Sequence, residues 1–124
     1  MSKIGEVFVN SYRVIIILGE LKVELMTKEL EQKFPKLYAT ENMKPEEVKV
    51  IAKFFDPCGS WTWYATEYDP VRRIFFGLVR GFEVELGNFG LEELEEVKGP
   101  LGLGIERDLY FGEHTLDEVM KKQL

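Results

Sequence analysis

The clearest candidate for recognition chemistry is the run Trp61-Thr62-Trp63-Tyr64. Side chains on a β-strand alternate between two faces, so Trp61 and Trp63 would share one face. If that face is open, the two indole rings form a stacking platform for a base, a sugar or a side chain of a partner. If it is packed, one or both tryptophans belong to the core, which is the commoner outcome. The strand carries no basic residue, which weakens the interpretation as a nucleic-acid site.

Acidic residues suited to acid–base chemistry or to binding a hard cation follow this run: Glu67, Asp69, Glu83 and Glu85. Glu83 and Glu85 share one strand face and could lie opposite Glu67 across a hairpin. Like charges placed there cost stability unless a cation or an arginine lies between them. No D-x-D-x-D-G calcium loop is present. A solvated acidic face is therefore favoured, and we expect neither a metal nor a cofactor.

The arginines give a weaker signal for an anion site. Arg107 follows a glycine-rich loop, but that loop is too short for a P-loop and lacks its Lys-Ser/Thr. Arg80 falls on the apolar phase of its strand, so we expect it to be paired or to lie at the end of the sheet. Ion pairing with neighbours such as Glu106 and Asp108 is the favoured interpretation for this group.

Cys58 and His114 have the residue types of a nucleophile and a base, but nothing in the sequence links them. No nucleophile signature surrounds Cys58, which lies in a Pro-Cys-Gly turn. A single cysteine also excludes an intramolecular disulfide and any multi-cysteine metal site. We therefore expect no cysteine–histidine enzyme.

The net charge of −6 is distributed unevenly along the 124 residues. Residues 1–60 carry nine bases and nine acids, whereas residues 61–124 carry seven bases and thirteen acids. The densest acidic face is predicted on one short helix, at Glu92, Glu93, Glu95 and Glu96. Such a surface repels phosphate and attracts basic partners, so coating of duplex nucleic acid is not expected. The alternative is a solvated face that keeps a small domain in solution.

Hydropathy patterns predict one α+β domain, an antiparallel meander sheet with two or three short helices. Strands are expected over residues 48–56, 61–68, 73–86 and 105–111, the third with a bend or turn near Arg80-Gly81. Its even-numbered positions are apolar, which predicts one buried face. Helices are expected after the N-cap Thr27, over residues 91–97, and after a capping box that begins at Thr115. Short connections between strands require antiparallel pairing.

The sequence resembles a small bacterial and mobile-element family known only as a domain of unknown function, number 2958. Five blocks carry the resemblance: Leu30-x-x-Lys33-x-Pro35-x-Leu37-Tyr38-x-Thr40-Glu41, Val50-x-x-Lys53-Phe54-Phe55-x-Pro57, Trp61-Thr62-Trp63-Tyr64-x-Thr66-Glu67, Phe76-Gly77-Leu78-Val79-x-Gly81-Phe82-Glu83-x-Glu85-Leu86-Gly87 and Gly99-Pro100-Leu101-Gly102-Leu103-x-Ile105-Glu106-Arg107-Asp108-Leu109. The chain departs from the pattern at Gly104, where we expect Pro, and at Gly90, where we expect Ser. The resemblance implies an accessory protein of plasmids, integrative elements and phages, and it supplies no catalytic residues.

Because this pattern begins near Val23, we divide the chain into an extension, residues 1–22, and one domain, residues 23–124. The extension is either a real β-hairpin over residues 6–18, with Asn10-Ser11 in its turn, or an over-called start upstream of a Val23 initiation codon. A real hairpin would offer an apolar edge for a homodimer. Otherwise we expect a monomer. Neither a membrane span nor a signal peptide is predicted, which favours a cytoplasmic protein.

Three functions are compatible with these residues. The first is a non-enzymatic binding protein whose acidic surface meets a basic protein partner, with an antirestriction or anti-defence role as one form. The second is a binder of a small molecule or single-stranded nucleic acid. This binder would use Trp61, Trp63 and Arg107. The wider set of candidate binding residues is Trp61, Trp63, Tyr64, Glu67, Arg80, Glu83, Arg107 and Asp108. The third is a carboxylate hydrolase that uses Glu67, Glu83 and Glu106.

Overall fold

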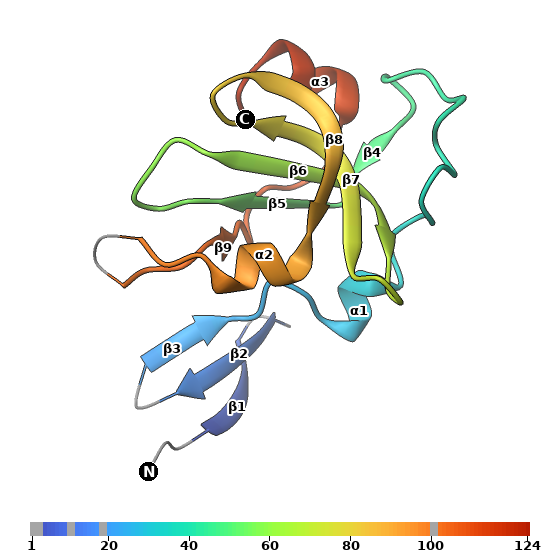
Figure 1. Ribbon diagram of the computed structural model, residues 1–124. Helices are drawn as coiled ribbons and strands as arrows, with labels where there is room; N and C mark the ends of the chain where they lie inside the picture. The colour runs from blue at the N-terminus through green and yellow to red at the C-terminus, as the bar shows by residue number, and fades with distance from the viewer. Residues whose placement is uncertain (1–3, 10–11, 18–19, 100–101) are drawn as a thin grey trace.

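The computed structural model describes the backbone of residues 4–9, 12–17 and 20–23, and the backbone and side chains of residues 24–99 and 102–124. Within these ranges the chain forms three antiparallel sheets and three short helices (Figure 1). The predicted α+β class, built on an antiparallel meander, is confirmed.

A five-stranded sheet forms the centre of the molecule. Four consecutive strands make its meander: β5 (Ala52–Phe55), β6 (Thr62–Asp69), β7 (Ile74–Arg80) and β8 (Val84–Gly90). The chain then crosses to the far edge, where β9 (Glu106–Arg107) pairs with β5. The strand order is therefore β8-β7-β6-β5-β9, with β8 and β9 on opposite edges. A small second sheet pairs β4 (Lys49–Val50) with β10 (His114–Thr115).

Local capping signals begin two of the three helices. Before α1 (Lys28–Glu31), the Thr27 hydroxyl accepts a hydrogen bond from the Leu30 N–H at 3.1 Å. Before α3 (Leu116–Lys121), Thr115 and Glu118 form the predicted capping box. By contrast, α2 (Leu91–Glu96) begins at Gly90, which has no side chain to cap it.

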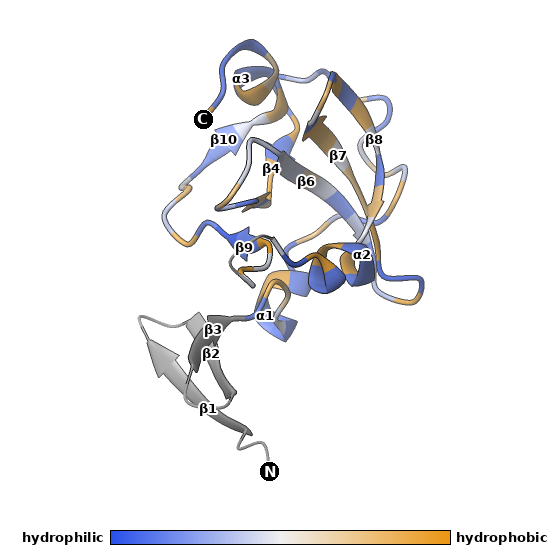
Figure 2. Ribbon diagram, turned by 60° about the vertical axis from the view of Figure 1, so that its left-hand side comes forward, coloured by the Kyte–Doolittle hydropathy of each residue, from blue (hydrophilic) through white to orange (hydrophobic). Residues whose placement is uncertain are grey.

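Both faces of the five-stranded sheet are packed. On one face, Phe54 and Phe75 are fully buried among residues that include Leu30 of α1 and Leu91 of α2. On the other face, Tyr64 packs with residues that include Val119 of α3. Figure 2 shows hydrophobic residues on β7 and on the helices.

This two-sided packing corrects the prediction of one buried face along residues 73–86. Phe75 lies on the odd-numbered face and is nevertheless fully buried, because α1 and α2 cover that face. The expected interruption near Arg80-Gly81 is confirmed, since β7 ends at Arg80 and β8 begins at Val84.

Two further predictions were wrong in register or length. A β-bulge between Ala65 and Glu67 shifts the pairing by one residue, so Glu67 lies opposite Phe76 of β7. Glu85 lies on the next strand, opposite Val79, so the expected placement of Glu67 across from Glu83 and Glu85 was wrong. The strand predicted over residues 105–111 is limited to β9. The Asp108 side chain accepts a hydrogen bond from the Tyr110 N–H at 2.9 Å, which forms a turn in place of a longer strand.

The N-terminal residues form their own antiparallel sheet. It contains β1 (Ile4–Val9), β2 (Tyr12–Ile17) and β3 (Glu20–Val23) in that order. In the described pairings these strands bond only to one another. The turn expected at Asn10-Ser11 lies outside the described residues.

Candidate functional site

The edge strand β8 is the most exposed strand among those whose side chains are described. Its inner side pairs with β7, and its outer side has no strand partner in the described part of the chain. Val84 is 53% exposed and Leu86 46% exposed, although both are aliphatic. A sheet edge with exposed apolar side chains is a template for pairing with another chain.

The two faces of β8 differ in chemistry. Glu85 lies opposite Val79, which packs on the same side of the sheet as α2. Leu86 lies opposite Leu78, which packs on the side covered by α3. In Figure 2 the strand accordingly alternates between hydrophilic and hydrophobic colours along its length. One face of the edge is therefore acidic and the other aliphatic.

The acidic face continues directly into α2, whose four glutamates are all exposed. Arg73 contacts two of them, with Nη1 3.2 Å from Glu92 Oε1 and Nη2 2.9 Å from Glu95 Oε1. No ion pair involves Glu93 or Glu96 within the described ranges. The helix therefore keeps most of its negative charge toward solvent.

An apolar cavity of about 370 Å³ opens beside the aliphatic face of β8. Leu86 and Asn88 of β8 line it together with residues of the loop that contains Tyr38 and Met43. Its position allows a side chain that lies next to Leu86 to enter it.

Glu67 lies at this cavity and is only 3% exposed, which contradicts its assignment to a solvated face. Its Oε1 accepts the Tyr38 N–H at 2.8 Å, and its Oε2 accepts the Thr40 N–H at 3.0 Å. The Thr40 hydroxyl also donates to Oε2. Three donors from one loop therefore hold this carboxylate, and Glu67 joins the loop to the sheet.

Both tryptophans are half-buried, so they form neither a fully open stacking platform nor a fully buried part of the core. Trp63 packs against the core, whereas the Trp61 ring covers Gly81, where a Cβ atom would lie 2.4 Å from the ring. Phe82, 94% exposed, meets the edge of Trp61 at a centroid distance of 5.3 Å. The two indoles are 5.9 Å apart, so this end of the sheet carries an aromatic cluster.

Tyr64 and Arg80 are used internally. Tyr64 is fully buried, its hydroxyl donates to the Leu124 carbonyl at 2.7 Å, and burial raises its pKa. Arg80 Nη2 donates to the Val119 carbonyl at 2.6 Å, at the C-terminal end of α3 where a cation is favourable. Arg80 lies at the end of β7, which is one of the two expected outcomes, but its described partners are backbone carbonyls and not the acids Glu106 or Asp108.

Arg107 and Asp108 lie at the opposite edge of the sheet from β8. Asp108 pairs with Lys53 at 3.5 Å, and Arg107 lines a small pocket that contains neither tryptophan. Glu83 flanks β8, so the hydrolase candidates Glu83 and Glu106 lie at opposite edges. The hydrolase alternative therefore has no clustered acids to support it.

The remaining candidates are separated. Cys58 is exposed in the turn between β5 and β6, whereas His114 lies in β10 and contacts Glu118 at 3.2 Å. That contact with His114 lowers the pKa of Glu118, and Arg72 lowers the pKa of Asp69 in the same way. Among residues 24–99 and 102–124, no three His, Cys, Asp or Glu side chains are grouped to hold a metal ion.

Comparison with known families agrees with the blocks of residues described above. The profile of a family described as a protein of unknown function, DUF2958, matches residues 25–121, which is most of the chain. The chain belongs to this family. No curated protein and no solved structure gives a significant match to it. The DUF2958 match therefore supplies a family without an activity.

This DUF2958 chain has no helix, among its described residues, that is long and apolar enough to span a membrane. Sequence reasoning missed the exposed edge formed by Val84 and Leu86, because an alternating pattern does not tell an edge strand from a central one. It also missed Lys33 and Lys53, which line the pocket with Arg107. The family resemblance could have drawn attention to these lysines, since both fall in the blocks that carry it.

Proposed function

We propose that this DUF2958 protein is a binding module that takes an extended segment of a basic protein partner as an added strand along β8. The observation that carries the proposal is the β8 edge, which is open on its outer side in the described part of the chain and exposes Val84 and Leu86. Strand addition of this kind draws affinity from main-chain hydrogen bonds and specificity from pockets for alternate side chains.

The chemistry of the two faces defines the segment. Residues that lie beside Glu85 and α2 meet negative charge, which favours Lys or Arg. Residues that lie beside Leu86 meet the apolar cavity, which favours an aliphatic or aromatic side chain. The preferred segment therefore alternates basic and apolar residues. An antirestriction or anti-defence role is one form of this proposal, with a basic nucleic-acid-binding protein as the partner.

A peptide of alternating Lys and Val tests the proposal directly. We expect it to shift the backbone amide NMR signals of residues 84–88 and of α2, and to bind more weakly as salt is added. A matched peptide with proline in place of valine cannot add a strand and should leave β8 unperturbed.

Charge reversal supplies the matched variants. Changing both Glu83→Lys and Glu85→Lys should weaken binding of the Lys/Val peptide about fivefold or more, because two exposed ion pairs are replaced by repulsion. Changing both Glu46→Lys and Glu47→Lys makes the same change in net charge at exposed positions outside β8 and should have little effect. Equal losses for both proteins, or shifts that avoid β8, would contradict strand addition.

A further inference from the structure

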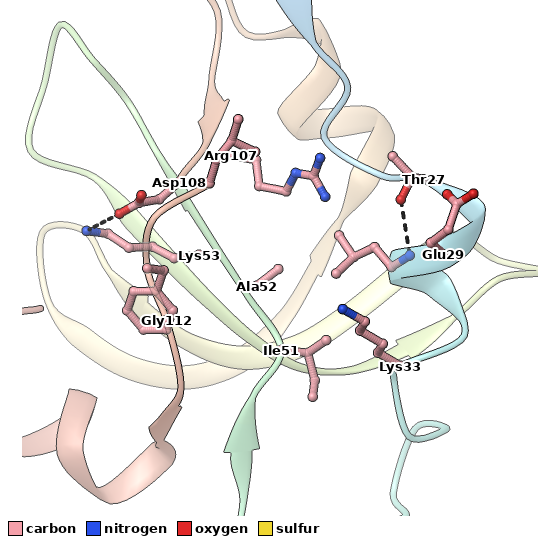
Figure 3. Close-up of a pocket in the computed structure, with 12 residues that line it drawn as sticks. Thr27, Glu29, Lys33, Ile51, Ala52, Lys53, Arg107, Asp108 and Gly112 are labelled. Atoms are coloured by element: carbon pink, nitrogen blue, oxygen red, sulfur yellow. Dashed lines mark hydrogen bonds and ion pairs between the residues drawn. The ribbon is translucent and has the colours of Figure 1, made fainter. Parts of the chain in front are cut away.

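A second pocket lies at the opposite edge of the sheet from β8, and its lining carries more basic than acidic side chains. It is formed by α1 and the turn after it, by β5, and by the chain that follows β9 (Figure 3). Its volume is about 180 Å³. Three bases, Lys33, Lys53 and Arg107, line it against two acids, Glu29 and Asp108. The pocket therefore has a local excess of positive charge within a chain of net charge −6.

Arg107 is the most firmly placed of these bases. It is 8% exposed, and the pairing of β9 with Phe54 of β5 fixes its backbone. Figure 3 shows its guanidinium extending into the space between β9 and α1. A guanidinium stays charged at ordinary pH, so Arg107 contributes positive charge to the pocket although its Nε and Nη2 atoms are themselves buried.

Further donors surround the same space. Lys33 directs its ammonium toward the centre of the pocket from the end of α1 (Figure 3). The Thr27 hydroxyl oxygen accepts from the Leu30 N–H, so its proton is available to donate. The Lys53 ammonium is 3.5 Å from Asp108 and has three N–H donors, so it can donate to a second acceptor as well.

We propose that this pocket binds a phosphate group of a small anionic ligand. The cavity is well below the roughly 300–1,000 Å³ of pockets that enclose a whole drug-sized molecule. It therefore encloses the phosphate and leaves the rest of the ligand outside. The phosphate can belong to the free ion, a nucleotide or the end of an oligonucleotide.

NMR titrations of the full chain test this proposal and distinguish the sources. The probes are inorganic phosphate, a nucleoside 5′-monophosphate, and one oligonucleotide with and without a 5′-phosphate. We expect amide shifts at residues 27–33, 52–53 and 107–109, and the probe that binds most tightly identifies the source. Absence of shifts there with every probe, or equal binding of the two oligonucleotides with no binding of the other probes, overturns the proposal.

Two surface lysines of the same segment provide matched variants. Lys33→Gln should weaken binding of the best probe about tenfold, because a charge-assisted hydrogen bond is lost. Lys28→Gln removes the same charge from an exposed position outside the pocket and should leave binding unchanged. Equal weakening by both would show general charge attraction and overturn the site. Arg107→Gln removes the charge of this side chain, and it should also weaken binding while the urea unfolding midpoint shows that the protein is folded.

Discussion

Glu67 shows how a single carboxylate can organise a loop. A buried carboxylate is costly unless it is hydrogen-bonded, and the loop from Tyr38 to Thr40 supplies the donors. Tyr38 has a φ of 70°, in the left-handed region that costs a non-glycine residue about 1–2 kcal/mol. The hydrogen bonds to Glu67 offset this cost and hold the loop against the sheet, where it forms one wall of the apolar cavity.

We predict that Glu67→Gln lowers the free energy of unfolding by about 2–3 kcal/mol. The substitution keeps the size of the side chain but replaces one accepting oxygen with an amino group, which then faces a backbone N–H. Urea unfolding followed by tryptophan fluorescence measures the loss.

Glu41→Gln is the control for this prediction. Glu41 lines the same cavity but is exposed, so its substitution should change stability by no more than about 0.5 kcal/mol. If the two variants unfold at the same urea concentration, Glu67 is not the attachment point of the loop. The sequence predicted a solvated Glu67 because the alternating pattern does not show that the loop from Tyr38 to Thr40 covers this position.

At the scale of elements, the sequence correctly predicted those features that depend on residues close together in the chain. The caps at Thr27 and Thr115 and the interruption at Arg80-Gly81 depend on residues within one turn of the chain. The length of β9 and the burial of Phe75 depend on the partner elements, which no local pattern contains. The same limit applies to the β8 edge, since its exposure follows from the strand order of the whole sheet.

Two glycines that face each other across β7 and β8 give a paired prediction. Gly77 lies opposite Gly87, yet a Cβ at Gly77 would lie 1.9 Å from the Tyr64 carbonyl oxygen, whereas one at Gly87 meets nothing within 4 Å. We expect Gly77→Ala to destabilise the protein by about 3 kcal/mol or more, because the clash is with backbone. Gly87→Ala should be neutral or should stabilise by up to about 1 kcal/mol.

Thermal and urea unfolding of both alanine variants check this difference. A large loss at Gly87 would mean that the β8 edge is covered in solution, and it would also count against strand addition. A small loss at Gly77 would mean that β6 and β7 are less closely packed than the register indicates.

For the whole molecule, the sheet separates two surfaces of opposite character. The acids of β8 and α2 are close in sequence, so the charge pattern alone located them. The bases of the pocket come from positions 33, 53 and 107, and only the fold brings them together. A cluster of side chains from distant segments, such as these three bases, therefore could not be predicted from the sequence.

The division of the chain at Val23 gives the last prediction. The strands β1–β3 pair with one another, and the DUF2958 match begins at residue 25, so residues 23–124 should hold the five-stranded sheet without them. We expect a chain of residues 23–124 to unfold cooperatively in urea with a free energy within about 0.5 kcal/mol of the full chain. A markedly lower midpoint would show that the N-terminal sheet supports the domain. Light scattering of both chains tests the N-terminal homodimer in the same experiment, because only the full chain would then be dimeric.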